Sequence, residues 1–257
     1  MTLNQKITAL KTILIKEILR FSRIWIQTIL PPAITMSLYF IIFGNLIGKA
    51  IGEMDGFKYI EYIIPGLIMM SVITNSYSNV VSSFFSAKLH GNIQELLISP
   101  TPNWIILLGY VGGGMARGLT VGLVVTLVSL FFSQLEIKHL LLTVLIVTMT
   151  SMLFSIAGLI NAVYAKTFDA INIVPTFILT PLTYLGGVFY SINMLSEFWQ
   201  TVSLANPVLY MVNGFRYGIL GVSDISPLAS FTLLVAFTAG LFWFALNLLN
   251  KGTGIRS

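Results

Sequence analysis

Long apolar runs separated by short polar stretches make up most of this sequence. A helix needs about 20 largely apolar residues to cross a lipid bilayer. The runs that approach this length are 24–47, 59–83, 104–132, 140–164, 171–190 and 228–249. They predict about six transmembrane helices, with five as the main alternative. Pro31 and Pro32 should kink the first span or mark its start. The third run is longer than needed, so its start should lie several residues in.

Residues 1–23 form a separate element. Apolar side chains recur there every three or four positions, which predicts one stripe of a helix: Leu3, Ile7, Leu10, Leu14, Ile18 and Phe21. Lys16, Arg20 and Arg23 fall roughly opposite this stripe. We therefore expect an N-terminal interfacial amphipathic helix whose cations face anionic lipid head groups. Whether it is a simple anchor or has a mechanical role stays open.

The composition agrees with a membrane protein. Hydrophobic residues make up 56% of the chain, charged residues 9%, and the mean hydropathy is +0.90. Soluble domains carry about 25% charged residues, so most of this surface must face lipid. The fold class is therefore all-α integral membrane. The charges lie at the ends of apolar runs, which favours membrane lipid over nucleic acid as the partner of the basic residues.

Lysine and arginine positions predict the orientation. With the N-terminus inside, the cytoplasmic side holds Lys6, Lys11, Lys16, Arg20, Arg23, Lys88, Lys166, Lys251 and Arg256. The outer side holds Lys49, Lys58 and Lys138. This asymmetry predicts a multi-pass protein with both termini in the cytoplasm.

Residues suited to catalysis or metal binding are scarce. The chain has no cysteine, and His90 and His139 lie far apart in sequence. No acid lies deep in a predicted span, and Gly44–Ala50 is one residue short of a phosphate-binding loop. We predict no catalytic, cofactor-binding or metal-binding residue.

Polar residues form stripes on two predicted spans. The second span carries Ser71, Thr74, Asn75, Ser78, Asn79 and Ser82 on one face. The fifth carries Asn172, Thr176, Thr180, Thr183 and Gly187, although Pro175 and Pro181 disturb its geometry. A polar stripe in lipid must face protein or a water-filled path. These stripes favour either a shared weakly polar conduit or bonding between helices.

The third span combines glycines with one cation. Gly109/Gly113 and Gly114/Gly118/Gly122 are spacings that let helix backbones approach closely. Arg117 would be costly at the bilayer centre. We expect it near the inner leaflet, with its side chain extending toward the head groups.

The polar stretch between the second and third spans predicts a short cytoplasmic helix. Asn92 is a candidate cap with Glu95 three positions on, and Pro100 and Pro102 end the helix. Ile93, Leu96 and Leu97 give it an apolar face. Either the membrane surface or a partner protein would cover that face.

Several of these segments together resemble the ABC-2 type permeases, the membrane subunits of one class of ATP-driven exporters. The resemblance covers essentially the whole chain. After the basic N-terminal helix, it rests on Trp25–Pro32, Phe57–Ser71, Asn92–Pro100, Pro181–Tyr190, Asn206, Pro207, Tyr210 and Arg216. Val208 departs slightly from the commonest residue choice after the proline. The sequence is most similar to stand-alone bacterial permeases of the enterobacterial inner-membrane type.

The resemblance implies a single transmembrane permease domain over residues 1–257, of the type V exporter-like class, in the bacterial cytoplasmic (inner) membrane. Residues 1–23 would be an amphipathic connecting helix, 24–190 the first five spans, and 228–249 the last. It also implies a homodimer above two copies of a separate cytoplasmic ATPase. ATP and Mg²⁺ would be bound by that ATPase, and no cofactor by this chain.

The resemblance also assigns roles to residues. The cytoplasmic coupling helix would be 86–100, with Lys88, Asn92, Glu95 and Leu96 at the ATPase. Lys166–Asp169 would make a second contact. The external re-entrant region would be 191–216, with Asn206, Pro207, Tyr210 and Arg216. The substrate path would include Ser71, Asn75, Ser78, Asn79, Thr176, Thr180 and Thr183.

The expected function is export of an amphiphilic or lipid-like substrate with ATP hydrolysed by the partner. An ion-coupled secondary transporter is one alternative, although such proteins usually carry intramembrane acids and inverted repeats. A non-transporting membrane assembly subunit is another. Drug, lipid, polysaccharide and siderophore exporters share such a scaffold, so the sequence leaves the cargo open.

Overall fold

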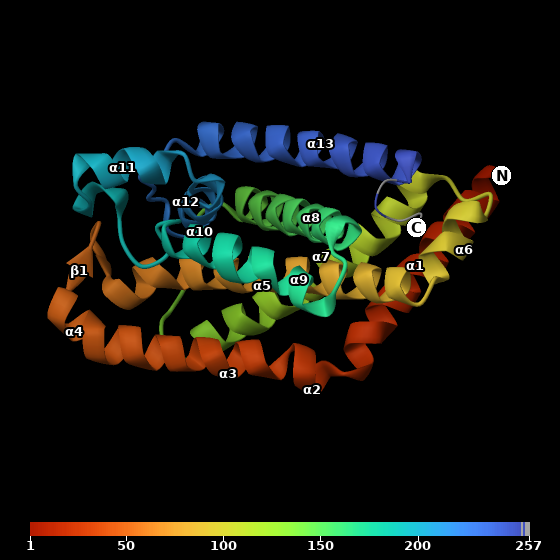
Figure 1. Ribbon diagram of the computed structural model, residues 1–257. Coiled ribbons are helices and arrows are strands. Elements are labelled where there is room, and N and C mark those ends of the chain that lie inside the picture. Colours follow the sequence, from red (N-terminus) through yellow and green to blue (C-terminus); the bar gives the residue numbers. More distant parts are fainter. Residues whose placement is uncertain (253, 255–257) are drawn as a thin grey trace.

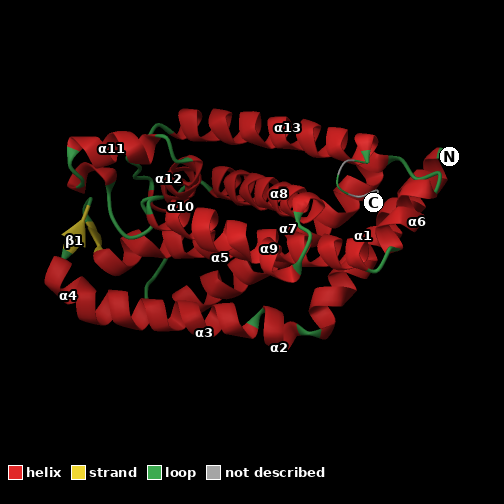
Figure 2. Cartoon of the chain, viewed as in Figure 1, coloured by secondary structure: helices red, strands yellow, loops and turns green. Residues whose placement is uncertain are grey.

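The computed structural model describes residues 1–252 and 254, and it is almost entirely helical (Figure 1, Figure 2). The N-terminal part contains α1 (Leu3–Arg23), α2 (Trp25–Thr28), α3 (Leu30–Tyr39), the π-helix η1 (Phe40–Ile47) and α4 (Gly48–Ile51). A hairpin of β1 (Glu53–Met54) and β2 (Phe57–Lys58) follows, and then α5 (Tyr59–Leu89), α6 (Asn92–Ile98), α7 (Asn103–Ser129) and α8 (Leu140–Tyr164). The remainder contains α9 (Phe168–Val174), the π-helix η2 (Pro175–Leu179), α10 (Thr180–Tyr184), the 3₁₀ turn η3 (Ile192–Met194), α11 (Glu197–Leu204), α12 (Pro207–Leu220) and α13 (Pro227–Lys251).

The helices form an elongated bundle with two distinct ends. Figure 1 shows the start of α1, the end of α13 and α6 at one end of the bundle, and α4, β1 and α11 at the other. The same arrangement is expected if the chain crosses a membrane an even number of times. Arg256, one of the cations used to predict orientation, lies outside the described residues.

Four segments of the described residues are long and apolar enough to cross a membrane: Trp25–Ile51, Asn103–Ser129, Leu140–Tyr164 and Pro227–Lys251. α5 is longer, with 31 residues, but its polar residues leave it outside this group. The predicted fifth span is divided into α9, η2 and α10, and the last two pieces have prolines in their first turns. Length and composition therefore support four of the six predicted crossings, and the other two stay predictions.

Prolines determine where two of these helices begin. Pro31 and Pro32 lie in the first turn of α3, after the short α2, which confirms that they mark a start. The expectation that the third helix begins several residues into its apolar run is wrong. Pro102 occupies the N-cap position and α7 starts directly after it, at Asn103, because the extended backbone at Pro102 already separates α7 from α6.

α5 is the centre of the bundle, and small residues let its neighbours approach closely. It packs on α7 along one side and on α8 along another. A Cβ atom added to Gly158 of α8 would lie 2.6 Å from the main-chain oxygen of Tyr77, so only glycine permits this crossing. Ser76 and Ser151 share a hydrogen bond of 2.8 Å across the same interface.

The glycines of α7 face two different partners, which confirms their predicted packing role. Gly109 and Gly113 contact Ile13 and Glu17 of α1. A second set contacts α5 and, in part, α8: Gly114, Gly118 and Gly122. The N-terminal helix is therefore held closely against the bundle.

α1 has the predicted extent, but its buried face differs from the predicted stripe. Ile13, Glu17 and Phe21 are buried, whereas Leu3 and Ile7 are exposed. The buried face differs from the predicted stripe because α1 packs on the glycines of α7. This packing places the Glu17 carboxylate in the interior. Its placement at a membrane surface stays a prediction.

Candidate functional site

A group of charged and polar side chains joins α1 to α5. The Glu17 side chain is completely buried, and Ser83 donates a hydrogen bond to it at 2.8 Å. Arg20 lies 3.3 Å from the same carboxylate. Nη2 of Arg20 also donates to the side-chain and main-chain oxygens of Asn79, each at 2.8 Å. Glu17 and Asn79 therefore hold the partly exposed guanidinium of Arg20 against the bundle, and the predicted contact of Arg20 with lipid head groups stays a prediction.

A second arginine lies further along the same face of α5. Nη2 of Arg117 donates to Oδ1 of Asn75 at 3.0 Å. Asn75 precedes Asn79 by four residues, so the two arginines bind successive turns of one helix face. Arg117 lies near the middle of α7. The expected extension toward head groups is not what the structure has, because Asn75 offers a closer acceptor.

A cavity of about 380 Å³ lies beside Arg117. Its walls come from α2, α3, α5 and α7, and they comprise Gln27, Pro31, Pro32, Thr35, Met36, Tyr39, Met70, Ser71, Thr74, Asn75, Ser78 and Arg117. Three predicted path residues of the second span therefore line one cavity: Ser71, Asn75 and Ser78. Asn79 is not among the lining residues and bonds to Arg20 instead.

The path residues predicted on the fifth span lie elsewhere. Thr176 and Thr180 are exposed, and Thr183 is buried, with its hydroxyl donating to the main-chain oxygen of Thr180 at 2.8 Å. Tyr184, at the end of this segment, shares a 3.3 Å hydrogen bond with the hydroxyl of Tyr39, which lines the cavity. The two predicted stripes therefore do not line one cavity within a single chain.

The short helix predicted between the second and third spans is present as α6, with an exposed and a covered face. It is shorter than the predicted 86–100, because residues 86–89 continue α5, and its coupling role stays a prediction. Ile93 is only 1% exposed, and Leu96 is partly buried against the bundle core. The core of this chain therefore covers the apolar face of α6, which was expected to lie on the membrane surface or on a partner protein. Asn92 and Glu95 are exposed, and Ile98 is 86% exposed.

The predicted cap of α6 is wrong. Gly91 takes the N-cap position with φ of 79°, and Asn92 is the first helical residue. The left-handed conformation at Gly91 turns the chain sharply out of α5, and glycine adopts it without steric cost. No side chain caps α6 among the described residues.

Lys88 bonds within the chain. Its ammonium donates to the main-chain oxygens of Val163 and Ala165, at 2.6 and 2.8 Å. It thereby caps the C-terminal end of α8, where carbonyl groups lack helical partners. Burial, together with the nearby Lys166, lowers the pKa of Lys88. Lys166 and Asp169 of the predicted second contact are exposed.

The opposite end of the molecule is organised around Arg216, which is completely buried on α12. Its Nη2 donates to the main-chain oxygen of Gly187 at 2.6 Å, and its Nε donates to that of Tyr62 at 3.3 Å. The guanidinium also lies 4.0 Å from the centre of the Tyr62 ring. Asp224 and Asp55 are close enough to stabilise its charge.

The other residues predicted in the external region define local turns. Asn206 caps α12 by accepting from the main-chain nitrogen of Val208 at 2.9 Å, and Pro207 follows in the first turn. The Tyr210 hydroxyl donates to the main-chain oxygen of Leu204 at 2.9 Å. These contacts hold α11 and α12 together as the short helices expected there.

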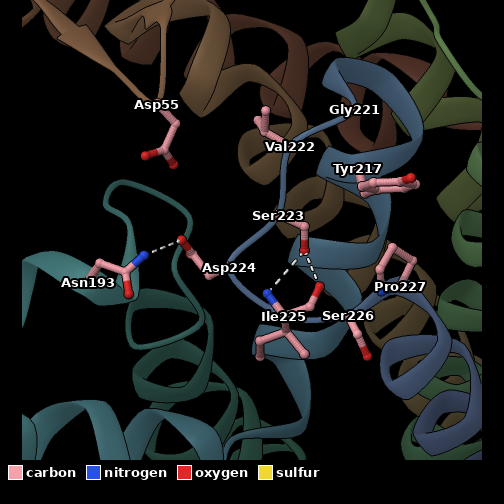
Figure 3. A pocket seen from close by; sticks show the side chains of 10 residues that line it. All are labelled: Asp55, Asn193, Tyr217, Gly221, Val222, Ser223, Asp224, Ile225, Ser226 and Pro227. Carbon is pink, nitrogen blue, oxygen red and sulfur yellow. Dashed lines mark hydrogen bonds between the residues drawn. The ribbon is translucent and has the colours of Figure 1, made fainter.

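A second cavity, of about 430 Å³, opens beside this region. Figure 3 shows Asp55, on the turn of the hairpin, facing Asp224 and Asn193 across the cavity. The amide of Asn193 donates to Asp224 at 3.4 Å, and the hydroxyl of Ser191 donates to the same carboxylate at 2.5 Å. Asp224 thereby connects the loop before α13 to the segment around η3.

Sequence reasoning missed Glu17 as a functional residue. It is the acidic residue of α1, and α1 was not among the spans in which acids were considered. Its position four residues after Ile13 and four before Phe21 was the available signal, because this spacing puts all three on one helix face.

Known proteins are similar to this sequence. Residues 8–220 match the profile of a family described as ABC-2 type transporter. The chain is 57% identical over 249 residues to the inner membrane transport permease YadH of Escherichia coli K12, with 97% of each chain covered. It is 20% identical over 207 residues to nodulation protein J of Rhizobium meliloti, with 80% of this chain and 79% of that protein covered.

Proposed function

The chain belongs to the ABC-2 type transporter family, and from this premise we propose that it is the membrane-spanning permease subunit of an ATP-binding cassette exporter. Two copies would pair in the bacterial inner membrane above two copies of a separate cytoplasmic ATPase. That ATPase would bind ATP and Mg²⁺, and this chain would move an amphiphilic or lipid-like substrate outward.

The proposed topology has six crossings, with both termini in the cytoplasm. α5 and the segment α9–η2–α10 would supply the two crossings beyond the four apolar ones. The shared location of the start of α1, the end of α13 and α6 supports this topology (Figure 1). So does the excess of lysine and arginine assigned to that side.

The observation that carries the proposal is the geometry of α6. This helix lies outside the predicted spans, is attached to the core by Ile93, and presents Asn92, Glu95 and Ile98 outward. A rigidly attached helix with an exposed face can transmit force from a partner into α5 and α7. Lys88 would contribute indirectly, by fixing the base of α6 against α8.

The test is co-purification with a candidate ABC ATPase from the same organism, followed by ATP hydrolysis and solute transport in liposomes. We expect Glu95→Lys to reduce complex formation and coupled hydrolysis, because it reverses the charge of the exposed face. Glu136→Lys, an exposed acid between α7 and α8, is the matched control and should leave both unchanged. Normal complex formation by Glu95→Lys would contradict the coupling role.

The same liposomes distinguish the alternative functions. Transport that continues without nucleotide and stops with an ionophore would identify an ion-coupled secondary transporter. Complex formation without solute movement, across a panel of amphiphiles, would identify a non-transporting assembly subunit.

A further inference from the structure

The cavity beside Arg117 is positively charged. Its lining contains a guanidinium, several hydroxyl and amide groups and, among the residues that the structure describes, no aspartate or glutamate. Its volume of about 380 Å³ falls within the range of small-ligand pockets, about 300–1,000 Å³. An anion is the ligand whose charge would complement this lining.

Arg117 has no counter-ion within the described chain. Its one hydrogen bond is to the neutral amide of Asn75, and its Nε is buried without a partner. Placing a cation away from water is costly unless an opposite charge is near. The charged neighbour that acts on Arg117 is Arg20, which is also a cation.

Arg20 illustrates how this chain compensates a cation when the role is structural. Glu17 lies 3.3 Å from Arg20 and is itself held by Ser83. That carboxylate accounts for one of the two arginines on this face of α5. The charge of Arg117 has no such carboxylate among the described residues, and Arg117 lines the cavity.

The rest of the cavity suits an amphiphile. Thr35, Thr74 and Ser78 offer hydroxyl groups, while Met36 and Met70 offer apolar contact. Guanidinium groups bind phosphate and carboxylate through paired hydrogen bonds. We propose that Arg117 binds the anionic head group, a phosphate or carboxylate, of the amphiphile that this permease transports. The proposal rests on the transport function above and specifies its substrate class.

Binding can be measured directly on the permease–ATPase complex in nanodiscs of zwitterionic lipid. The probes are hexadecyl phosphate, neutral hexadecyl maltoside and inorganic phosphate. We expect Arg117→Gln to weaken hexadecyl phosphate binding at least about tenfold, because a charge-assisted contact is lost. Hexadecyl maltoside binding should not change. Arg23→Gln, which removes an exposed cation of α1 outside this cavity, is the matched control and should bind both as the parent does.

A second variant separates head-group binding from a packing role. Asn75→Asp keeps the size of the side chain and places a carboxylate about where Oδ1 now lies, 3.0 Å from Nη2 of Arg117. An internal ion pair would then compete with the ligand. We expect the complex to stay assembled while hexadecyl phosphate binding falls at least about tenfold. Arg117→Lys should retain part of the affinity, since it keeps the charge and loses the paired geometry.

Three results would overturn the proposal. The first is unchanged hexadecyl phosphate affinity in both Arg117→Gln and Asn75→Asp. The second is loss of affinity in Arg23→Gln alone, which would assign binding to the surface of α1. The third is inorganic phosphate competing as well as hexadecyl phosphate, which would indicate an ion site. If ATP-driven transport failed while Arg117-dependent binding persisted, the result would contradict the exporter function. The proposed binding site would then still stand.

Discussion

Two arginines inside the bundle, Arg216 and Arg117, are held in different ways. Arg216 is completely buried, with two main-chain carbonyls, the face of Tyr62 and nearby carboxylates around it. Arg117 has one amide partner and a second cation as its charged neighbour. Each leaves one nitrogen without a partner, Nη1 in Arg216 and Nε in Arg117.

Access is what separates the two sites. Arg216 is enclosed by α5, α12 and the segment around Gly187 and exposes none of its surface. Arg117 lines a cavity. An enclosed cation with nearby carboxylates is suited to holding elements together, whereas an accessible cation without a counter-ion is suited to binding. The following substitutions test this distinction, beginning with the largest expected effect.

Replacing Arg216 should have the largest effect on stability. Arg216→Ala removes the hydrogen bonds to the carbonyls of Tyr62 and Gly187 and opens a cavity beneath α12. We expect the free energy of unfolding to fall by about 3–5 kcal/mol. Arg216→Lys should recover little, because one ammonium cannot reproduce the planar geometry that serves both carbonyls. Thermal unfolding of the detergent-solubilised protein measures the loss.

The exposed Arg23 gives the control for this prediction, since Arg23→Ala should unfold at the temperature of the parent protein. A parent-like melting temperature for Arg216→Ala would mean that the contacts around Arg216 do not hold α12 to α5.

The next substitution tests how α1 packs on α7, because this packing holds Arg20 against the polar face of α5. Gly113 contacts the Cβ of Glu17, so Gly113→Leu would push α1 outward and separate Arg20 from Asn79. We expect a loss of about 1–3 kcal/mol from overpacking. Thermal unfolding measures it, with Gly240→Leu as control, because an added Cβ at Gly240 on α13 meets no atom within 4 Å. Equal melting temperatures for the two variants would show that α1 is not tightly packed.

The bundle could be predicted well where periodicity and length act alone. α8 has the predicted bounds, and α13 extends the predicted span by one residue at its start and two at its end. The broken segment from α9 to α10 was harder, because Pro175 and Pro181 interrupt hydrogen bonding without removing the apolar run that predicts a span. Hydropathy measures composition, and these breaks depend on backbone geometry.

The candidate site was predicted only in part. The stripe on α5 was correctly identified as polar, and Ser71, Asn75 and Ser78 do line a cavity. The sequence did not indicate that Asn75 and Asn79 each bind an arginine from a different helix. Those pairs depend on how α1 and α7 cross α5, and crossing angles depend on tertiary packing that one helix pattern does not contain. The two predicted conduit stripes stay apart for the same reason.

Replacing Arg117 should have the smallest effect on stability. Glutamine can still donate to Asn75, and the substitution removes a cation that has no counter-ion. We expect Arg117→Gln to change the free energy of unfolding by less than about 1 kcal/mol, and Asn75→Asp to raise it by supplying the missing charge. Thermal unfolding beside Arg216→Ala makes the comparison direct. If Arg117→Gln destabilised the protein as strongly as Arg216→Ala, both arginines would be structural, and the uncompensated charge at the cavity would no longer indicate a ligand.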